Sequence, residues 1–355
     1  MRPCFYLLFL AWIGISCSDK DSLPDEVAKA DFSRLYVSFE EYNTSNAGVP
    51  DSNIRIISRA DSTVFAFDQA HVSTAKGGGL IYFNPFLRAL IHSTKETEAI
   101  NDQTIYLLGI GTKGELNNSA SMRSPLFSTI KGIAHHSSSE SLMLVNQDGN
   151  NSGIHIVYRP RNMSPQYRPY RKLYTSGLVM GATFFAADKL FVLKTNDSFG
   201  LYVFDGVLTR TVSTIDSSTT ISPSFIIPIE GANQVHAVAY DSLHNQLAIT
   251  DYTDGKILGT GRILIFDAFS QQLQQRKLTP TRIITGPATG LTRPIAIALD
   301  TRSSAQYFYV ADHSKKILRF KLTDVGDVIP DQIILTEQTP AGIALDARNS
   351  STLPK

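Results

Sequence analysis

The chain has 355 residues, of which 43% are hydrophobic and 18% are charged, and this balance is typical of a folded globular protein rather than a disordered one. Lys and Arg number 33 and Asp and Glu number 32, so the charge gives no electrostatic reason to expect a nucleic-acid partner. The two cysteines, Cys4 and Cys17, both lie near the N-terminus. The rest of the chain therefore has no disulfide and no thiol nucleophile.

The first residues read as an export signal. Arg2 is followed by an unbroken apolar run over residues 4–15, which has the length of a signal-peptide core and is short for a membrane span. Residues 14–17, Gly-Ile-Ser-Cys, resemble the cleavage site of bacterial lipoproteins, with glycine where leucine is usual. The resemblance implies a signal peptide over residues 1–16 and a lipid anchor on Cys17 that holds the protein at the outer membrane or cell surface. The alternative is an ordinary secretory signal that is cut nearby.

Residues 17–33 are predicted to be a flexible tether. The polar, acidic run over residues 18–26 has no apolar pattern that could pack. It is similar to the acidic export signal of surface lipoproteins in the Bacteroidetes, and a plain solvated linker is the alternative. Residues 34–355 are then expected to form one domain.

Internal repeats dominate that domain. Six segments of seven residues carry small or apolar side chains through their middle, and this near-continuous apolar character predicts strands that are buried on both faces. Small residues suit the innermost strand of a propeller blade, where neighbouring blades crowd together. The segments are residues 78–84, 130–136, 179–185, 235–241, 294–300 and 340–346.

Further apolar strands follow each of these segments. The predicted second strands are residues 90–91, 142–145, 190–193, 247–249 and 307–310. The predicted third strands are residues 105–108, 154–158, 201–204, 263–266 and 317–320. The predicted fourth strands are residues 126–127, 173–174, 225–227, 283–284 and 333–335. Four strands in each unit of about 50 residues indicate the blades of a β-propeller.

The sixth unit is divided between the two ends of the chain. Only nine residues follow residues 340–346, and the three missing strands are found at residues 35–38, 54–57 and 64–67. Strands from the N-terminus would therefore complete the C-terminal blade, close the ring and remove open sheet edges. The predicted fold is all-β, a six-bladed β-propeller with four-stranded blades.

The last third of the chain resembles a known repeat family. Residues 293–300 (RPIAIALD), followed by residues 309–320 (YVADHSKKILRF), are similar to an NHL repeat, and residues 340–346 (PAGIALD) are similar to the start of another. The resemblance implies a TolB-like six-bladed propeller. It does not define an activity, because this fold carries lactonases, lyases, receptors and plain scaffolds.

Motifs for chemistry are sparse. Residues 109–114 match the dinucleotide-binding fingerprint letter for letter, but no apolar helical period follows, so a turn between two blade strands is predicted. His236 opens an inner strand and could bind a metal, although no two further histidines occupy matching positions. The sequence predicts no cofactor. The alternative is a calcium ion in the channel, held by Asn146, Asn196, Asp251 and Asp312, each of which follows a second strand. These four could equally be turn residues that bond their own backbone.

One face of the propeller is expected to carry the ligand site, because long loops on a rigid scaffold commonly bind ligands. The loops over residues 40–52, 94–102 and 251–261 lie on this face, together with six candidate ligand-binding residues, Asn146, Asn196, His236, Asp251, Arg293 and Asp312. An Arg- and Tyr-rich stretch over residues 158–174 is on the opposite face, where it is expected to pin a loop to its blade.

Two functions remain open from the sequence. The first is a non-catalytic surface lipoprotein, a monomeric domain that binds a protein, peptide or glycan. The alternative is a propeller hydrolase, lactonase or lyase with a metal ion in the central channel. The absence of a recognisable catalytic triad or metal-ligand set in the sequence favours the first.

Overall fold

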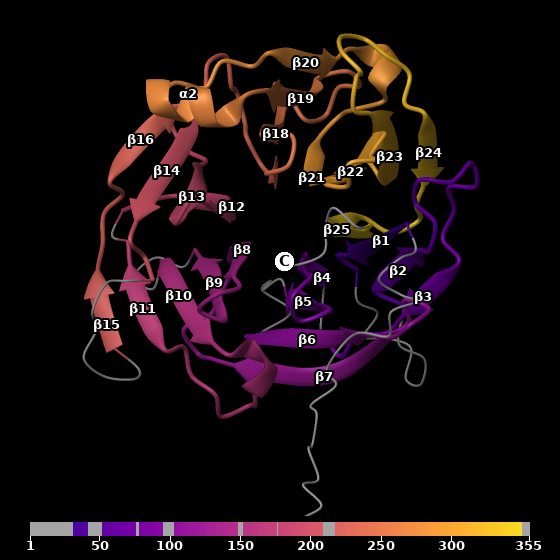
Figure 1. Cartoon of the computed structure of the whole chain (residues 1–355). Helices are drawn as coiled ribbons and strands as arrows, with labels where there is room; N and C mark the ends of the chain where they lie inside the picture. The colour runs from indigo at the N-terminus through magenta and orange to yellow at the C-terminus, as the bar shows by residue number, and fades with distance from the viewer. Residues whose placement is uncertain are drawn as a thin grey trace, which may run out of the picture.

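The computed structural model describes residues 31–41, 52–75, 78–94, 103–147, 152–175, 177–208 and 217–349. These residues form six sheets arranged as blades around a central channel (Figure 1). The protein is therefore an all-β, six-bladed propeller, which confirms the predicted fold. Within the described ranges no helix is long and apolar enough to cross a bilayer. The predicted signal peptide and Cys17 lie outside them.

Each blade is built from four consecutive antiparallel positions, counted from the channel outward. Blade 1 contains β4 (Gly78–Asn84), β5 (Ala89–Thr94), β6 (Thr104–Ile110) and β7 (Leu116–Arg123). Blade 2 contains β8 (Ile130–His136), β9 (Ser141–Asn146), β10 (Gly153–Tyr158) and β11 (Arg171–Tyr174). Blade 3 contains β12 (Met180–Ala186), β13 (Lys189–Lys194), β14 (Gly200–Asp205) and β16 (Phe225–Pro228).

The remaining blades come from the C-terminal half and the N-terminus. Blade 4 contains β17 (Val238–Asp241), β18 (Gln246–Tyr252), β19 (Gly261–Phe266) and β20 (Arg282–Thr285). Blade 5 contains β21 (Pro294–Leu299), β22 (Tyr307–Asp312), β23 (Lys316–Lys321) and β24 (Gln332–Leu335). Blade 6 contains β25 (Pro340–Arg348), β1 (Phe32–Phe39), β2 (Ile54–Ile57) and β3 (Gln69–His71).

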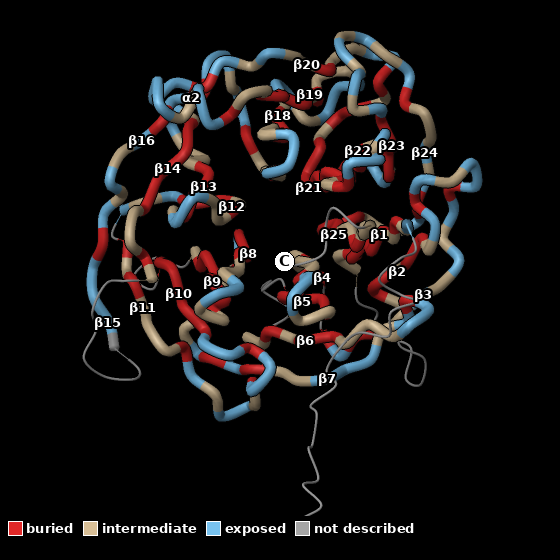
Figure 2. Tube along the Cα trace, viewed as in Figure 1, coloured by how far each residue is buried: buried red, intermediate tan, exposed pale blue. Residues whose placement is uncertain are grey.

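The hydrophobic core consists of six clusters, one between each pair of neighbouring blades. This arrangement explains the near-continuous apolar character of the inner and second strands, because both faces of these strands are covered. Figure 2 shows the same pattern, with buried residues concentrated in the inner strands and exposed residues toward the rim. Close approach of blades also selects glycine at Gly78, where a Cβ atom would lie 1.9 Å from the carbonyl oxygen of Phe39 in blade 6.

Blade 6 is assembled from both ends of the chain, as predicted. Strand β1 pairs antiparallel with β25 on one side and with β2 on the other, and Leu35 is in register with both Leu345 and Ile57. The N-terminal strands thus lie between the C-terminal strand and the rim, which closes the ring.

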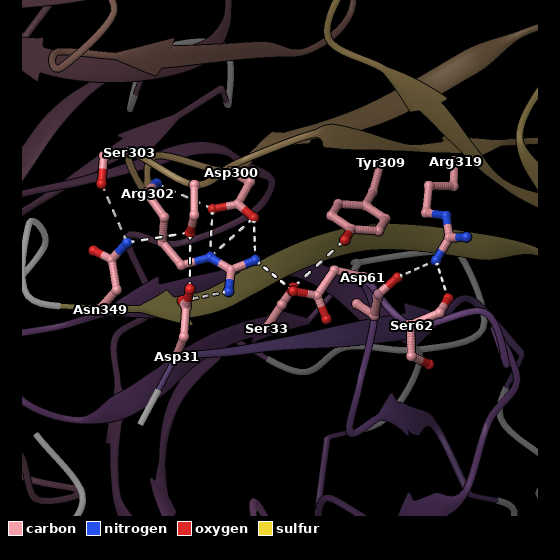
Figure 3. Close-up of polar contacts among 12 residues, drawn as sticks. Asp31, Ser33, Asp61, Ser62, Asp300, Arg302, Ser303, Tyr309, Arg319 and Asn349 are labelled. Atoms are coloured by element: carbon pink, nitrogen blue, oxygen red, sulfur yellow. Dashed lines mark hydrogen bonds and ion pairs between the residues drawn. The ribbon is translucent and has the colours of Figure 1, made fainter. Parts of the chain in front are cut away.

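Polar contacts fasten blade 6 to blade 5 (Figure 3). The buried guanidinium of Arg302 forms ion pairs with Asp31 at 2.8 Å, Asp61 at 2.7 Å and Asp300 at 2.6 Å. A second arginine, Arg319, donates hydrogen bonds to the carbonyl oxygens of residues 60 and 62 at 2.7 and 2.6 Å. Side chains of one blade therefore satisfy backbone and carboxylate groups of the next.

Two outer strands differ from the prediction. The outer strand of blade 1 is β7, not residues 126–127, and Phe127 instead fills the core from a loop, 2% exposed. The third strand of the split blade is β3, not residues 64–67. Val64 is 74% exposed, whereas Phe65 stacks on Tyr309 in a loop. Outer strands need little apolar character because one face meets solvent, so apolar residues in nearby loops gave the stronger signal.

Three other features complete the description. Strand β15 (Ser217–Thr220) adds to the outer edge of blade 2, parallel to β11. A short helix, α2 (Phe269–Gln275), covers the space between blades 3 and 4, where Phe269 joins the core. Residues 109–114 form the turn between β6 and β7, in which the Gly111 N–H donates to the Glu115 carbonyl oxygen, as the sequence predicts.

Candidate functional site

The central channel is the main cavity in the described part of the chain, with a volume of about 2070 Å³. Inner strands of all six blades line it. We call the opening where the inner strands begin the A mouth and the opening where they end the B mouth. Antiparallel pairing places the ends of the second strands at the A mouth, because Ile130 pairs with Asn146 and Pro294 pairs with Asp312. The six candidate residues therefore all belong to this end of the propeller.

Three of these candidates, Asn146, Asp251 and Asp312, are fully buried and are engaged with backbone groups. The Asp312 carboxylate accepts hydrogen bonds from the N–H groups of Thr292 and Arg293 at 2.8 and 2.9 Å. In each blade the side chain holds the loop that leads into the inner strand of the same blade.

The same contact recurs in the two other blades. The Asp251 carboxylate accepts from the N–H groups of Asn233 and Gln234 at 3.0 and 2.6 Å and forms an ion pair with Arg262. The Asn146 carbonyl oxygen accepts from Ser128 N–H at 3.0 Å. These residues act as turn residues, which was the alternative interpretation of the pattern.

Asn196 does not share this position. Lys194 pairs with Met180 at the end of β13, so Lys194 is the residue in register with Asn146, and Asn196 lies two residues beyond. Asn196 lines the channel and donates a hydrogen bond to Asp197 at 3.1 Å. The four predicted oxygen ligands are therefore not brought together around one point. No group of three or more His, Cys, Asp or Glu side chains in the described ranges is arranged to hold a metal.

His236 lies at the A mouth and is half-buried. Its Nδ1 donates a hydrogen bond to the carbonyl oxygen of Ile295 in the next blade at 2.9 Å, because only a protonated nitrogen can bond a carbonyl oxygen. Burial lowers the pKa of His236 to about 4, and the nearby charge of Lys131 lowers it further, against the opposing effect of the Ile295 bond. The ring is thus neutral at pH 7, with its Nε2 lone pair available as an acceptor.

Arg293 stands beside His236 on the same rim. Its guanidinium lies over the ring of Tyr252, with 5.7 Å between the guanidinium carbon and the ring centroid. Its backbone is fixed by Asp312, and its carbonyl oxygen accepts from His313 N–H at 2.9 Å. Its Nε finds no hydrogen-bond acceptor among the residues that the structure describes. The stack on Tyr252 therefore holds a positive charge at the mouth.

Two cationic or titratable residues at this mouth escaped the sequence analysis. Lys131 lies at a β-bulge in β8, where pairing shifts between Ile130 and Gly132, and the bulge turns its side chain to the channel. His313 directly follows Asp312 and also lines the channel. The available signal was positional: Lys131 and His236 each come one residue after the start of an inner segment.

The B mouth is also basic, but its arginines are engaged locally. Arg348 forms an ion pair with Asp346 at 2.6 Å, and Arg161 donates to the carbonyl oxygen of Phe86 at 3.2 Å. Arg88 is the third arginine of this end.

The Arg- and Tyr-rich stretch has a structural role. Tyr167 donates to the carbonyl oxygen of Tyr158, and Arg171 donates to the carbonyl oxygen of Leu208 at 3.0 Å. Arg168 donates to the carbonyl oxygen of Arg123 at 3.4 Å. These bonds pin the loop to blades 1 to 3, as the sequence predicts.

Comparison with known proteins identifies the fold. No family model matches the sequence, and no curated protein matches it. A chain in the crystal structure of a nidogen/laminin complex is similar, with a TM-score of 0.56 and 13% identity over 88% of this chain and 98% of that chain. A periplasmic gluconolactonase of Pseudomonas aeruginosa is similar to the same extent, with a TM-score of 0.56 and 10% identity over 88% and 98%. One of these proteins is part of a binding complex and the other is an enzyme, so the likeness establishes a six-bladed propeller and no activity.

Proposed function

We propose that this protein is a non-catalytic binding propeller that takes a protein, peptide or glycan ligand at the A mouth. The carboxylates expected to hold a channel metal, Asp251 and Asp312, instead hold the backbone of the loops. They leave a mouth with fixed polar side chains. The channel volume of about 2070 Å³ exceeds the range of about 300–1,000 Å³ that suits a single small molecule. Such a cavity suits a segment of a polymer or a protruding loop.

Export and anchorage belong to the same proposal. The resemblance of residues 14–17 to a lipoprotein cleavage site supports a lipid on Cys17 and a position at the outer membrane or cell surface. The NHL-like and TolB-like character of blade 5 supports the same class of exported propellers.

One observation favours a second candidate function, a hydrolase, lactonase or lyase. His236 is neutral at pH 7 and keeps its Nε2 lone pair at the channel, which is the state that a general base or a metal ligand requires. This candidate needs further ligands or a nucleophile, and His236 alone does not provide them.

The test is a binding screen of the mature protein against arrays of glycans and peptides. The paired variant His236→Gln with Arg293→Gln alters the A mouth, and the matched pair Arg168→Gln with Arg171→Gln alters the outer loop near the opposite face. Loss of the captured ligand in the first pair alone is expected. Loss in the second pair alone would move the site to the outer loop and refute the proposal.

A further inference from the structure

Positive charge is concentrated in the channel of an otherwise neutral chain. The whole chain has 33 Lys and Arg against 32 Asp and Glu. The described channel lining contains five Lys and Arg, at positions 88, 131, 161, 293 and 348, and two acidic residues, Glu40 and Asp197. A cleft lined by one sign of charge focuses the field and raises the local concentration of oppositely charged ligands. The channel is therefore suited to anions.

The charges at the A mouth converge on one place. Lys131 comes from blade 2, His236 from blade 4, and Arg293 and His313 from blade 5. The positive charges of Lys131, Arg293 and His313 all act on the His236 ring, so the four side chains surround a common region. Like charges at short range repel one another, and an anion bound between them would relieve that repulsion.

Arg293 is the best-prepared anion contact in this group. The Tyr252 ring holds the plane of its guanidinium, and none of the described residues accepts a hydrogen bond from this side chain. A planar guanidinium with a fixed orientation matches a carboxylate with two parallel hydrogen bonds. Lys131 adds a point charge from another blade.

His236 adds a different requirement. Its Nδ1 hydrogen is used by the Ile295 carbonyl oxygen, so Nε2 can only accept. A ligand that fits both His236 and Arg293 must carry a hydrogen-bond donor close to its anionic group. An acidic sugar has ring hydroxyls close to its carboxylate, whereas an aspartate or glutamate side chain has no donor of its own at that distance.

We propose that the A mouth binds an acidic oligosaccharide, with a carboxylate on Arg293 and Lys131 and a neighbouring hydroxyl that donates to Nε2 of His236. This inference rests on the proposed binding function and specifies its ligand class. The channel volume accommodates more than one sugar unit, so a chain segment rather than a monosaccharide is the expected ligand.

The experiment is calorimetric titration of the mature protein with three probes: tri-galacturonate, an alginate trisaccharide and a hyaluronan tetrasaccharide. The fully methyl-esterified form of each probe has nearly the same size and no charge. We expect at least one acid to bind, its ester to bind at least about tenfold more weakly, and affinity to fall as salt is raised. A tri-aspartate peptide tests a purely anionic ligand without sugar hydroxyls.

Variants test the assigned contacts. Arg293→Gln is expected to weaken binding of the acid at least about tenfold, and the surface control Arg168→Gln to leave it unchanged. Lys131→Gln, on another blade, provides an independent variant if Arg293→Gln does not fold, and its affinity should also fall. His236→Gln keeps a donor to Ile295 but loses the ring acceptor, so it should weaken the acidic sugar and leave tri-aspartate unaffected.

The outcomes separate this inference from the proposed function. Equal binding of acid and ester, unchanged affinity in both Arg293→Gln and Lys131→Gln, or tighter binding of tri-aspartate than of any acidic sugar would overturn the assignment. Failure of all three acids to bind would also overturn it. A different ligand from the arrays that is lost in the A-mouth pair would then leave the proposed function intact, whereas a ligand lost only in the outer-loop pair would refute both.

Discussion

Removal of Arg302 should weaken the closure of the ring more than removal of any surface ion pair. Its side chain is 3% exposed and Asp300 is 1% exposed, so Arg302→Met leaves a buried carboxylate without its cation. The expected loss is about 3–5 kcal/mol of the free energy of unfolding. Asp31 and Asp61 are 51% and 37% exposed, so each of these pairs contributes no more than about 1 kcal/mol.

The assay is urea unfolding of the mature protein, followed by a double-mutant cycle. Asp300→Asn removes the charge that Arg302→Met strands, so the double variant should be more stable than Arg302→Met alone. Arg159→Met provides the control, because Arg159 and Glu140 form an exposed pair at 3.1 Å and their loss should cost less than about 1 kcal/mol. A change of under about 0.5 kcal/mol for Arg302→Met, or strict additivity of the two substitutions, would refute the reasoning.

The other predictions concern closure, packing, pH and anchorage. Deletion of residues 340–355 removes the inner strand of blade 6, so aggregation or loss of a cooperative thermal transition is expected, and an unchanged melting curve would contradict the split blade. Gly78→Ala places a Cβ against a backbone oxygen of blade 6 and should lower Tm by several degrees in calorimetry. The pKa of His236 is about 4 in the folded protein against an ordinary 6.5, so the folded state binds fewer protons than the unfolded state between these values. Stability is therefore complete above about pH 6.5 and falls as the pH drops toward 4, and His236→Gln should flatten that part of the curve of Tm against pH. Cys17→Ala should move the protein from the membrane fraction to the soluble fraction, and retention in the membrane would show that the anchor is elsewhere.

The architecture was predictable because its inner strands carry a strong and repeated signal. Each inner strand packs between two other blades, so apolar and small residues run through it without alternation, as in β21 (Pro294–Leu299). The division of blade 6 was predictable for a related reason. A lone inner strand at the C-terminus and three unassigned strands at the N-terminus are complementary only if the ring closes between them.

Outer strands were less predictable because solvent covers one of their faces. Strand β7, with the sequence LNNSASMR, has few apolar residues, yet it pairs with β6 along its length. Phe127 and Phe65, by contrast, lie in loops that pack on the core, and their apolar character suggested strands that do not exist there. Burial in a loop and burial in a strand give the same local composition.

The candidate site was predictable in its face and only partly in its residues. His236, Arg293 and Asn196 line the channel, as the sequence analysis expected. Asn196 was aligned with Asn146, but pairing ends at Lys194, and a count of apolar residues does not show where pairing ends.

Lys131 was missed because a β-bulge turns it toward the channel. Its proximity to Arg293 depends on the closed ring, in which blades 2 and 5 both face the channel. Neither fact is visible in a single repeat.

Metal analysis of the purified mature protein tests the central claim most directly. Mass spectrometry for metals after gel filtration in metal-free buffer should find neither calcium nor zinc in stoichiometric amount, because Asp251 and Asp312 are already engaged by backbone N–H groups. The protein should still bind its ligand at the A mouth after treatment with a chelator. One calcium or zinc ion per chain, with loss of binding or appearance of hydrolysis that depends on it, would contradict a non-catalytic binding function and favour the propeller hydrolase or lyase.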